Sequence, residues 1–327
     1  LRGLGLPEEA GGAGADLLTS CVLLEEVAVG DADLAVVLGE TSLLACGMHS
    51  AMNDAQRKRW MPKFEGNERF HLALIARDAD TERGWSYYEA MPEHDLPVGT
   101  PDVTAKRSGK GWVINGLAPF VSNAPVAGLF IVQAKIEGED GTVTVLLGSD
   151  AKGLSIDEEL PAFGEGGAHA HWAHGAIASV TLDGCKVAEE DVIAADAAQR
   201  LLHGDLHARR MVQMTAINVG VSRAAYEAAV DYAKMRWQGG RHIVEHQAIG
   251  MKLADVAIQL EAARGLALKA AFIADHPDAV SERSVNDLPD DIEVVAYCRG
   301  PFCVYADQAV HQLTRRGRRA RRLEDGF

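Results

Sequence analysis

Hydrophobic residues follow a helical period near both ends of this 327-residue chain and a strand period in its middle. Apolar positions recur every three or four residues in 17–29 and 34–52, and the same spacing returns after about residue 195. Between these regions lie short runs of β-forming residues, divided by Gly, Asp and Asn, at 103–106, 112–114, 129–134, 143–147 and 177–182. Strands gathered in one stretch argue against a doubly wound nucleotide-binding fold, in which strands and helices alternate.

This order predicts an α+β fold with three domains. We expect a partial N-terminal helical domain over 1–70, a middle β-barrel-like domain over 71–190 and a C-terminal four-helix bundle over 191–327. The polar, proline-containing stretch 276–291 predicts a loop between helices of the bundle. The chain begins at Leu1 without an initiator methionine or a signal pattern, so we expect it to be N-terminally incomplete.

The composition limits the classes of function. A chain that is 47% hydrophobic and 24% charged is typical of soluble globular proteins, and a formal charge of −15 argues against nucleic acid as its main partner. No apolar run approaches the roughly 20 residues that span a bilayer, so we expect no membrane association. The five cysteines are scattered, odd in number and without a Cys-x-x-Cys pair, which favours a reducing, cytoplasmic location.

Two helical patterns in the C-terminal third meet at the segment Arg236-Trp-Gln-Gly-Gly-Arg-His-Ile243. Small apolar residues line one face over 221–233, which lets helices approach closely, and the same period resumes from Val256. The pair Gly239-Gly240 permits positive φ and is expected to stop the first helix. An arginine and two glycines between packed helices can form an anion site. A capping arginine beside a bare turn is the alternative.

This helix–loop–helix resembles the C-terminal domain of the acyl-CoA dehydrogenase family. The matching residues are Tyr232, Ala233, Arg236, Gly240, Gln247 and Leu253-Ala254-Asp255, and weaker matches follow in the same order from Pro7-Glu8 and Gln56-Arg57-Lys58. The resemblance implies that Arg236, Gln238 and Gln247 contact the diphosphate of an FAD bound mainly by a neighbouring subunit. It therefore implies a homo- or hetero-tetramer.

A second matching segment lies in the β domain, where Ile114-Asn-Gly116 is followed by Phe120-Val121-Ser122-Asn123. It resembles the family segment that borders the flavin, which implies that Phe120 packs on the isoalloxazine, that Ser122 hydrogen-bonds near N5 and that Asn123 belongs to the same contact. An aromatic ring and a hydroxyl two residues apart on one strand can supply a dry wall and a hydrogen-bond donor. A plain strand with a polar end is the alternative.

Two segments depart from the family pattern. Where the family has Thr-Glu-Pro-x-x-Gly-Ser-Asp, this chain has 76–83 without the proline, the glycine or the serine, and near the C-terminus His311-Gln312-Leu313 runs into Thr314-Arg-Arg-Gly317 without a glycine pair. Flavin and phosphate contacts from these segments are therefore altered. A non-catalytic subunit that completes a partner's FAD site stays open as a second interpretation.

The resemblance implies that the catalytic base is Glu324, in the segment Leu323-Glu324-Asp325-Gly326. Removing a proton next to a thioester carbonyl needs a carboxylate whose pKa is raised by burial, while a hydride passes to the flavin. A second branch of the family carries its base on the helix that begins near Asp205, where this chain has Arg209 or Arg210. A solvated terminal acid is the alternative interpretation of Glu324.

The sequence also contains a cluster of histidines and a run of arginines. His169, His171 and His174 could supply two metal ligands, but the glycines just before them favour a mobile loop, so we predict no metal site. Six arginines lie within 315–322, and in so acidic a chain we expect a subunit contact or a cradle for CoA or FAD phosphates.

Taken together, these features predict an FAD-dependent acyl-CoA dehydrogenase-like oxidoreductase of fatty acid metabolism. The resemblance implies that it forms an α,β double bond in an acyl-CoA thioester and passes electrons to an electron-transfer flavoprotein. The alternative is the non-catalytic subunit of a hetero-oligomeric acyl-CoA dehydrogenase.

Overall fold

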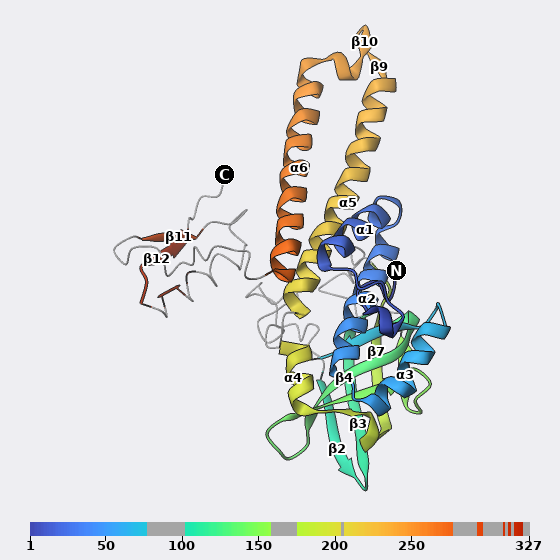
Figure 1. Cartoon of the computed structure of the whole chain (residues 1–327). Helices are drawn as coiled ribbons and strands as arrows, with labels where there is room; N and C mark the ends of the chain where they lie inside the picture. Colours follow the sequence, from blue (N-terminus) through green and yellow to red (C-terminus); the bar gives the residue numbers. More distant parts are fainter. Residues whose placement is uncertain are drawn as a thin grey trace, which may run out of the picture. The chain divides into compact units, whose positions relative to one another are not determined.

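The computed structural model describes residues 1–76, 102–157, 175–203, 206–276, 293–296, 310, 313–314 and 317–322. They fall into two compact units, the larger drawn from Leu1–Glu82 and Gly99–Asp275 and the smaller from Arg83–Val98 and His276–Phe327. In the larger unit, helices come first, strands follow and helices return, as Figure 1 shows by colour. The predicted α+β class is confirmed, because strands are gathered in the middle of the sequence.

The N-terminal helices begin at polar caps. After the short 3-10 helix η1 (Glu8–Ala10), the helices are α1 (Leu17–Gly30), α2 (Ala32–Ala51) and α3 (Asp54–Gly66). Asp16 and Asp31 each accept a hydrogen bond from a backbone N–H in the first turn that follows, and Asn53 forms a capping box with Gln56. The helices predicted over 17–29 and 34–52 are therefore present, with sharp starts set by these caps.

Helix α2 is the one helix among the described residues that is long and apolar enough to cross a membrane. The expectation that no apolar run reaches such a length was therefore wrong. Length and composition alone are weak evidence, since a buried core helix passes the same test, and 56% of its most apolar window is buried. Leu44 and Met48 of this helix are fully buried against the sheet.

The middle of the chain forms an eight-stranded mixed sheet in the order β6-β7-β3-β2-β4-β5-β8, with β1 paired to β4. The strands are β1 (His71–Ile75), β2 (Asp102–Ser108), β3 (Gly111–Ser122), β4 (Ala127–Ile136), β5 (Thr142–Gly148), β6 (Leu154–Asp157), β7 (Ile177–Ala188) and β8 (Val192–Ile193). Each predicted strand lies inside one of them. In β4, Phe130 and Val132 pack in one core while Leu129 and Ile131 pack in another with α2 and α3, because alternate side chains point to opposite faces.

The C-terminal part of the larger unit contains α4 (Ala195–His203), α5 (Leu206–Met235) and α6 (Gln247–Asp275). Helices α5 and α6 run antiparallel (Figure 1). The carboxylate of Glu25 on α1 joins them: it accepts from Arg223 of α5 at 2.7 Å and from Nε of Arg264 of α6 at 2.9 Å. Of the predicted four-helix bundle, the described residues show these three helices.

Small residues let α1 and α5 approach closely. A Cβ added to Gly220 of α5 would collide with the backbone carbonyl oxygen of Glu25 and lie 2.9 Å from the Cβ of Ala28. Gly220 lies one residue before the predicted small face of 221–233, so this crossing does not test that prediction. In the smaller unit the described elements include β11 (Val294–Ala296), which pairs in parallel with β12 (Ala320–Arg322). All but the first residue of the predicted loop 276–291 lies outside the described residues.

The turn between α5 and α6 differs from its prediction. Helix α5 already ends at Met235, and the chain then forms a hairpin of β9 (Trp237–Gln238) and β10 (Arg241–His242), followed by η5 (Ile243–Glu245). Gly239 and Gly240 have φ angles of 64° and 82°, as a two-residue hairpin turn of type I′ requires. The prediction that the glycines stop the helix was therefore wrong, because they reverse the chain after it has ended.

Candidate functional site

The end of strand β3 carries the residues that were predicted to border a flavin. Phe120 lies in β3 and Ser122 is its last residue, paired with Ile177 of β7. The pairing slips between Ala118 and Val121, and such irregularities re-aim side chains beside active sites. The Ser122 side chain is exposed, and its hydroxyl bonds to none of the described residues. A hydroxyl in this position is available to a ligand.

Asn123 follows directly and points the other way, into the protein. It is fully buried, with φ 65° and ψ 0°, and its Nδ2 lies 3.1 Å from the Val37 oxygen, 3.1 Å from Thr41 Oγ1 and 3.2 Å from the Leu72 oxygen. These bonds give its side chain an anchoring role between β3, α2 and β1. A direct contact of Asn123 with the cofactor stays a prediction.

Two neighbours of Asn123, Thr41 and His71, were not predicted. Thr41 Oγ1 lies 2.9 Å from Nδ1 of His71, the first residue of β1. Burial lowers the pKa of His71, and the positive charge of Arg2 lowers it further. A neutral imidazole therefore accepts the hydroxyl hydrogen of Thr41 at Nδ1. The one local signal for this cluster in the sequence was Asn123 itself, because asparagine tolerates the left-handed backbone conformation.

The hairpin at the far end of α5 and α6 brings the other predicted cofactor residues together. Arg236 precedes β9, Gln238 ends it and Gln247 begins α6, and all three are exposed. Within the described part of the chain, the Arg236 guanidinium has no ion pair or hydrogen bond, so it does not cap α5. His246 Nε2 donates to the backbone oxygen of Gln238 at 2.9 Å and fixes the turn. A free cation beside two amides suits an anionic ligand.

The structure does not bring the hairpin and the end of β3 together. Arg210 near the start of α5 bonds both carboxylate oxygens of Glu40, at 2.9 and 2.7 Å, and Glu40 precedes Thr41 on α2. Positions 210 and 235 are 25 residues apart on α5, which corresponds to about 38 Å at 1.5 Å per residue. The two sets of residues therefore cannot contact the same part of one cofactor molecule.

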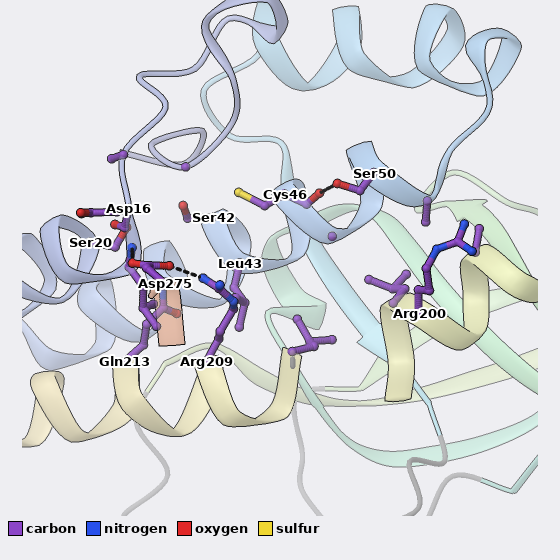
Figure 2. Close-up of a pocket in the computed structure, with 18 residues that line it drawn as sticks. Asp16, Ser20, Ser42, Leu43, Cys46, Ser50, Arg200, Arg209, Gln213 and Asp275 are labelled. Carbon is purple, nitrogen blue, oxygen red and sulfur yellow. Dashed lines mark hydrogen bonds and ion pairs between the residues drawn. The ribbon is translucent and has the colours of Figure 1, made fainter. Parts of the chain in front are cut away.

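A cavity of about 400 Å³ lies on another face of α2, between α1, α4 and α5 (Figure 2). Its wall includes Ser42, Cys46 and Gln213, and burial raises the pKa of the Cys46 thiol. Figure 2 shows Arg209 bonded to Asp275, at 2.9 Å, and Asp275 also accepts from the backbone N–H of Leu17 at 2.6 Å. None of the predicted site residues lines this cavity.

The remaining predictions divide in two. Arg209 and Arg210 both form ion pairs, with Asp275 and Glu40 respectively. Several predictions fall outside what the structure describes: Glu324, the histidines His169, His171 and His174, the segments 77–83 and 311–312, Arg315 and Arg316, and the side chain of Phe120. Arg321 of the arginine-rich run is described and pairs with Glu293 at 3.0 Å.

Comparison with known proteins matches both helical regions to one family. Residues 1–68 match the acyl-CoA dehydrogenase N-terminal domain, and residues 200–286 match the C-terminal domain. The chain is 29% identical over 280 residues to benzylmalonyl-CoA dehydrogenase of Aromatoleum aromaticum, which covers 84% of the chain and 67% of the relative. It is 25% identical over 290 residues to the mitochondrial short-chain specific acyl-CoA dehydrogenase of Homo sapiens, covering 84% and 64%.

Solved structures show the same fold. A glutaryl-CoA dehydrogenase from Mycobacterium smegmatis in complex with FADH2 superposes with a TM-score of 0.66 at 17% identity, covering 84% of this chain and 65% of that one. The chain thus spans about two thirds of the length of the proteins it resembles.

Proposed function

We propose, because this chain belongs to the acyl-CoA dehydrogenase family, that it is an FAD-dependent oxidoreductase acting on CoA thioesters. The observation that carries the proposal is the pair of domain matches on either side of the sheet, with the exposed Ser122 hydroxyl at the end of β3. The reaction is the formation of an α,β double bond in the acyl group, as part of fatty acid metabolism. An electron-transfer flavoprotein is the proposed acceptor.

The residues of this chain have distinct tasks in that reaction. Ser122 would donate a hydrogen bond to the flavin, and Phe120 in the same strand would pack against its ring. Glu324 takes the α-proton of the thioester, which requires burial beside the substrate to raise the pKa of its carboxyl group. FAD, when bound, supplies the acceptor for the β-hydride. The donors at the end of β3 and at the hairpin suit this cofactor, since the Ser122 hydroxyl and the side-chain amide and guanidinium groups of the hairpin lack bonds to described residues.

The hairpin is proposed to serve a second subunit. Arg236, Gln238 and Gln247 lie too far from Ser122 to contact the same flavin, so they would hold the diphosphate of a neighbour's FAD. Large apolar side chains are exposed along the same helices and support burial in a homo- or hetero-tetramer: Tyr232, Met235, Met251, Ile258 and Leu266. The three described cysteines are free, in keeping with a cytoplasmic protein.

A non-catalytic subunit is the second candidate. The segment 76–83 lacks the proline, glycine and serine of the family pattern, which removes flavin contacts from the chain's own pocket. The hairpin keeps the residues that would complete a partner's site. In that case the chain would bind FAD only together with a related subunit.

The visible spectrum of the purified protein tests the proposal. The protein is incubated with FAD, freed of excess cofactor and titrated with a panel of acyl-CoA esters. Bound flavin that bleaches with an ester, and no longer bleaches in Glu324→Gln, would support the enzyme. Asp325→Asn, which removes the neighbouring acid, should bleach normally. Flavin that binds only after co-expression with a related subunit would favour the second candidate, and no flavin in either case would refute both.

A further inference from the structure

The backbone conformation of Asn123, the residue that follows Ser122, is unusual. Among the described residues it is the only one besides glycine with a positive φ angle. The left-handed region is costly for most side chains and is tolerated by Asn when its side chain bonds nearby. The positive φ of Asn123 is therefore stabilised by the residues around its side chain.

The surroundings also fix the orientation of the Asn123 amide. The oxygens of Val37 and Leu72 are backbone carbonyls, which can only accept, so the amide nitrogen must face them. The two hydrogens of this nitrogen are shared among three oxygens, so Thr41 Oγ1 accepts a bifurcated bond from it and gives its own hydrogen to His71. The Asn123 Oδ1 is buried without a partner in the described part of the chain. A buried acceptor without a hydrogen bond lowers the stability of the fold. Function therefore explains this backbone conformation better than stability does.

These bonds determine where Ser122 lies. Val37 and Thr41 belong to α2 and Leu72 to β1, so one side chain ties the end of β3 to two other elements. The Asn123 N–H also donates to the oxygen of Ala176, just before β7. Ser122 is covalently joined to this anchor and is the last paired residue of its strand. Loss of the anchor would leave its hydroxyl free to move.

We propose that Thr41 and Asn123 are positioning residues, which act through Ser122 and hold its hydroxyl in place for the flavin. The inference rests on the proposed function, because it assigns a purpose to the end of β3. Thr41 is the better residue to alter, since its hydroxyl can be removed with little change in volume. Its contribution passes through Asn123 and should vanish when Ser122 has no hydroxyl to position.

A double-mutant cycle tests this coupling. The dissociation constant of FAD is measured by flavin fluorescence for Thr41→Val, Ser122→Ala and the double variant. Thr41→Val should weaken FAD binding roughly fivefold or more, as expected for loss of a buried hydrogen bond. In the Ser122→Ala background the same change should have less than a twofold effect. Thr41→Ser, which keeps the hydroxyl, should bind FAD like the unaltered protein.

Controls separate positioning from general damage. Thr144→Val makes the same change at a buried threonine of β5 and should leave FAD binding unchanged. Asn123→Gly keeps the positive φ but removes the amide, so it should repeat the effect of Thr41→Val even if the latter folds poorly. Equal weakening by Thr41→Val with and without the Ser122 hydroxyl would overturn the inference but leave the proposed function intact. A lack of FAD binding by the unaltered protein, alone and with a related subunit, would overturn both.

Discussion

Replacing the buried Glu25 by glutamine should loosen the contact of α1 with α5 and α6. Glu25 is 1% exposed, and its carboxylate accepts from Arg223 at 2.7 Å and from Arg264 at 2.9 Å to each oxygen. Glutamine fills nearly the same volume but carries no charge, and its amide N–H groups face guanidinium donors. The change therefore removes the charge-assisted bonds without creating a cavity.

The size of the effect follows from what each arginine retains. Breaking a buried ion pair costs about 3–5 kcal/mol. Arg223 keeps its bonds to Glu26, both at 2.6 Å, and the Arg264 side chain is 35% exposed, so water replaces part of what it loses. We therefore expect the lower end, about 3 kcal/mol in the free energy of unfolding. At about 2–4 °C per kcal/mol, the melting temperature should fall by roughly 6–12 °C.

Calorimetry and urea unfolding of the two proteins measure this difference. Glu26→Gln is the matched control, because its side chain is 56% exposed and exposed pairs contribute about 1 kcal/mol or less. Adding Arg264→Gln to Glu25→Gln should lower stability less than Arg264→Gln does alone. A fall in the melting temperature of Glu25→Gln by less than about 2 °C, or by no more than that of the control, would refute this role of Glu25.

Three further predictions concern other parts of the fold. Because the pKa of His71 is lowered on folding, the unfolded chain binds more protons below a pH of about 6.5, so stability should fall as the pH drops below that value. The urea midpoints at pH 7.5 and 5.5 should therefore differ less in His71→Gln than in the unaltered protein. An equal difference in the two proteins would contradict this. Gly220→Ala should cost about 1–3 kcal/mol, because the added methyl group collides with α1, and a neutral result in urea would show that the helices can separate. Arg236→Gln should weaken FAD binding about tenfold through loss of a charge-assisted bond while leaving the melting temperature unchanged, and unaltered binding would remove Arg236 from the site.

Local periodicity was enough to predict most of the elements. The strands lie where short β-forming runs were seen, and α1 and α2 match the helical patterns, because burial on one face imposes its own period on the sequence. The end of α5 was misjudged because the residues between Met235 and the glycines carry no periodic signal. A hairpin of two-residue strands is too short to be told from a helix end.

The contacts that shape the site could not be read from the sequence. Asn123 was identified as part of a motif, but its partners Thr41 and Leu72 lie 82 and 51 positions away. The pairing of Glu25 with Arg264 spans 239 positions. Such contacts depend on how helices dock on the sheet, which no local pattern specifies. The hairpin residues Arg236, Gln238 and Gln247 could be grouped from the sequence, because they are close together along the chain.

The separations of these contacts along the chain also have a consequence for how the protein refolds. Helices α5 and α6 are joined by the short segment 236–246, so their mutual contacts form between near neighbours and should appear early. The tie at Asn123 needs β1, β3 and α2 to assemble first, and closing such long loops is slow. A chain diluted from denaturant should therefore recover its helical circular dichroism well before it can retain a flavin.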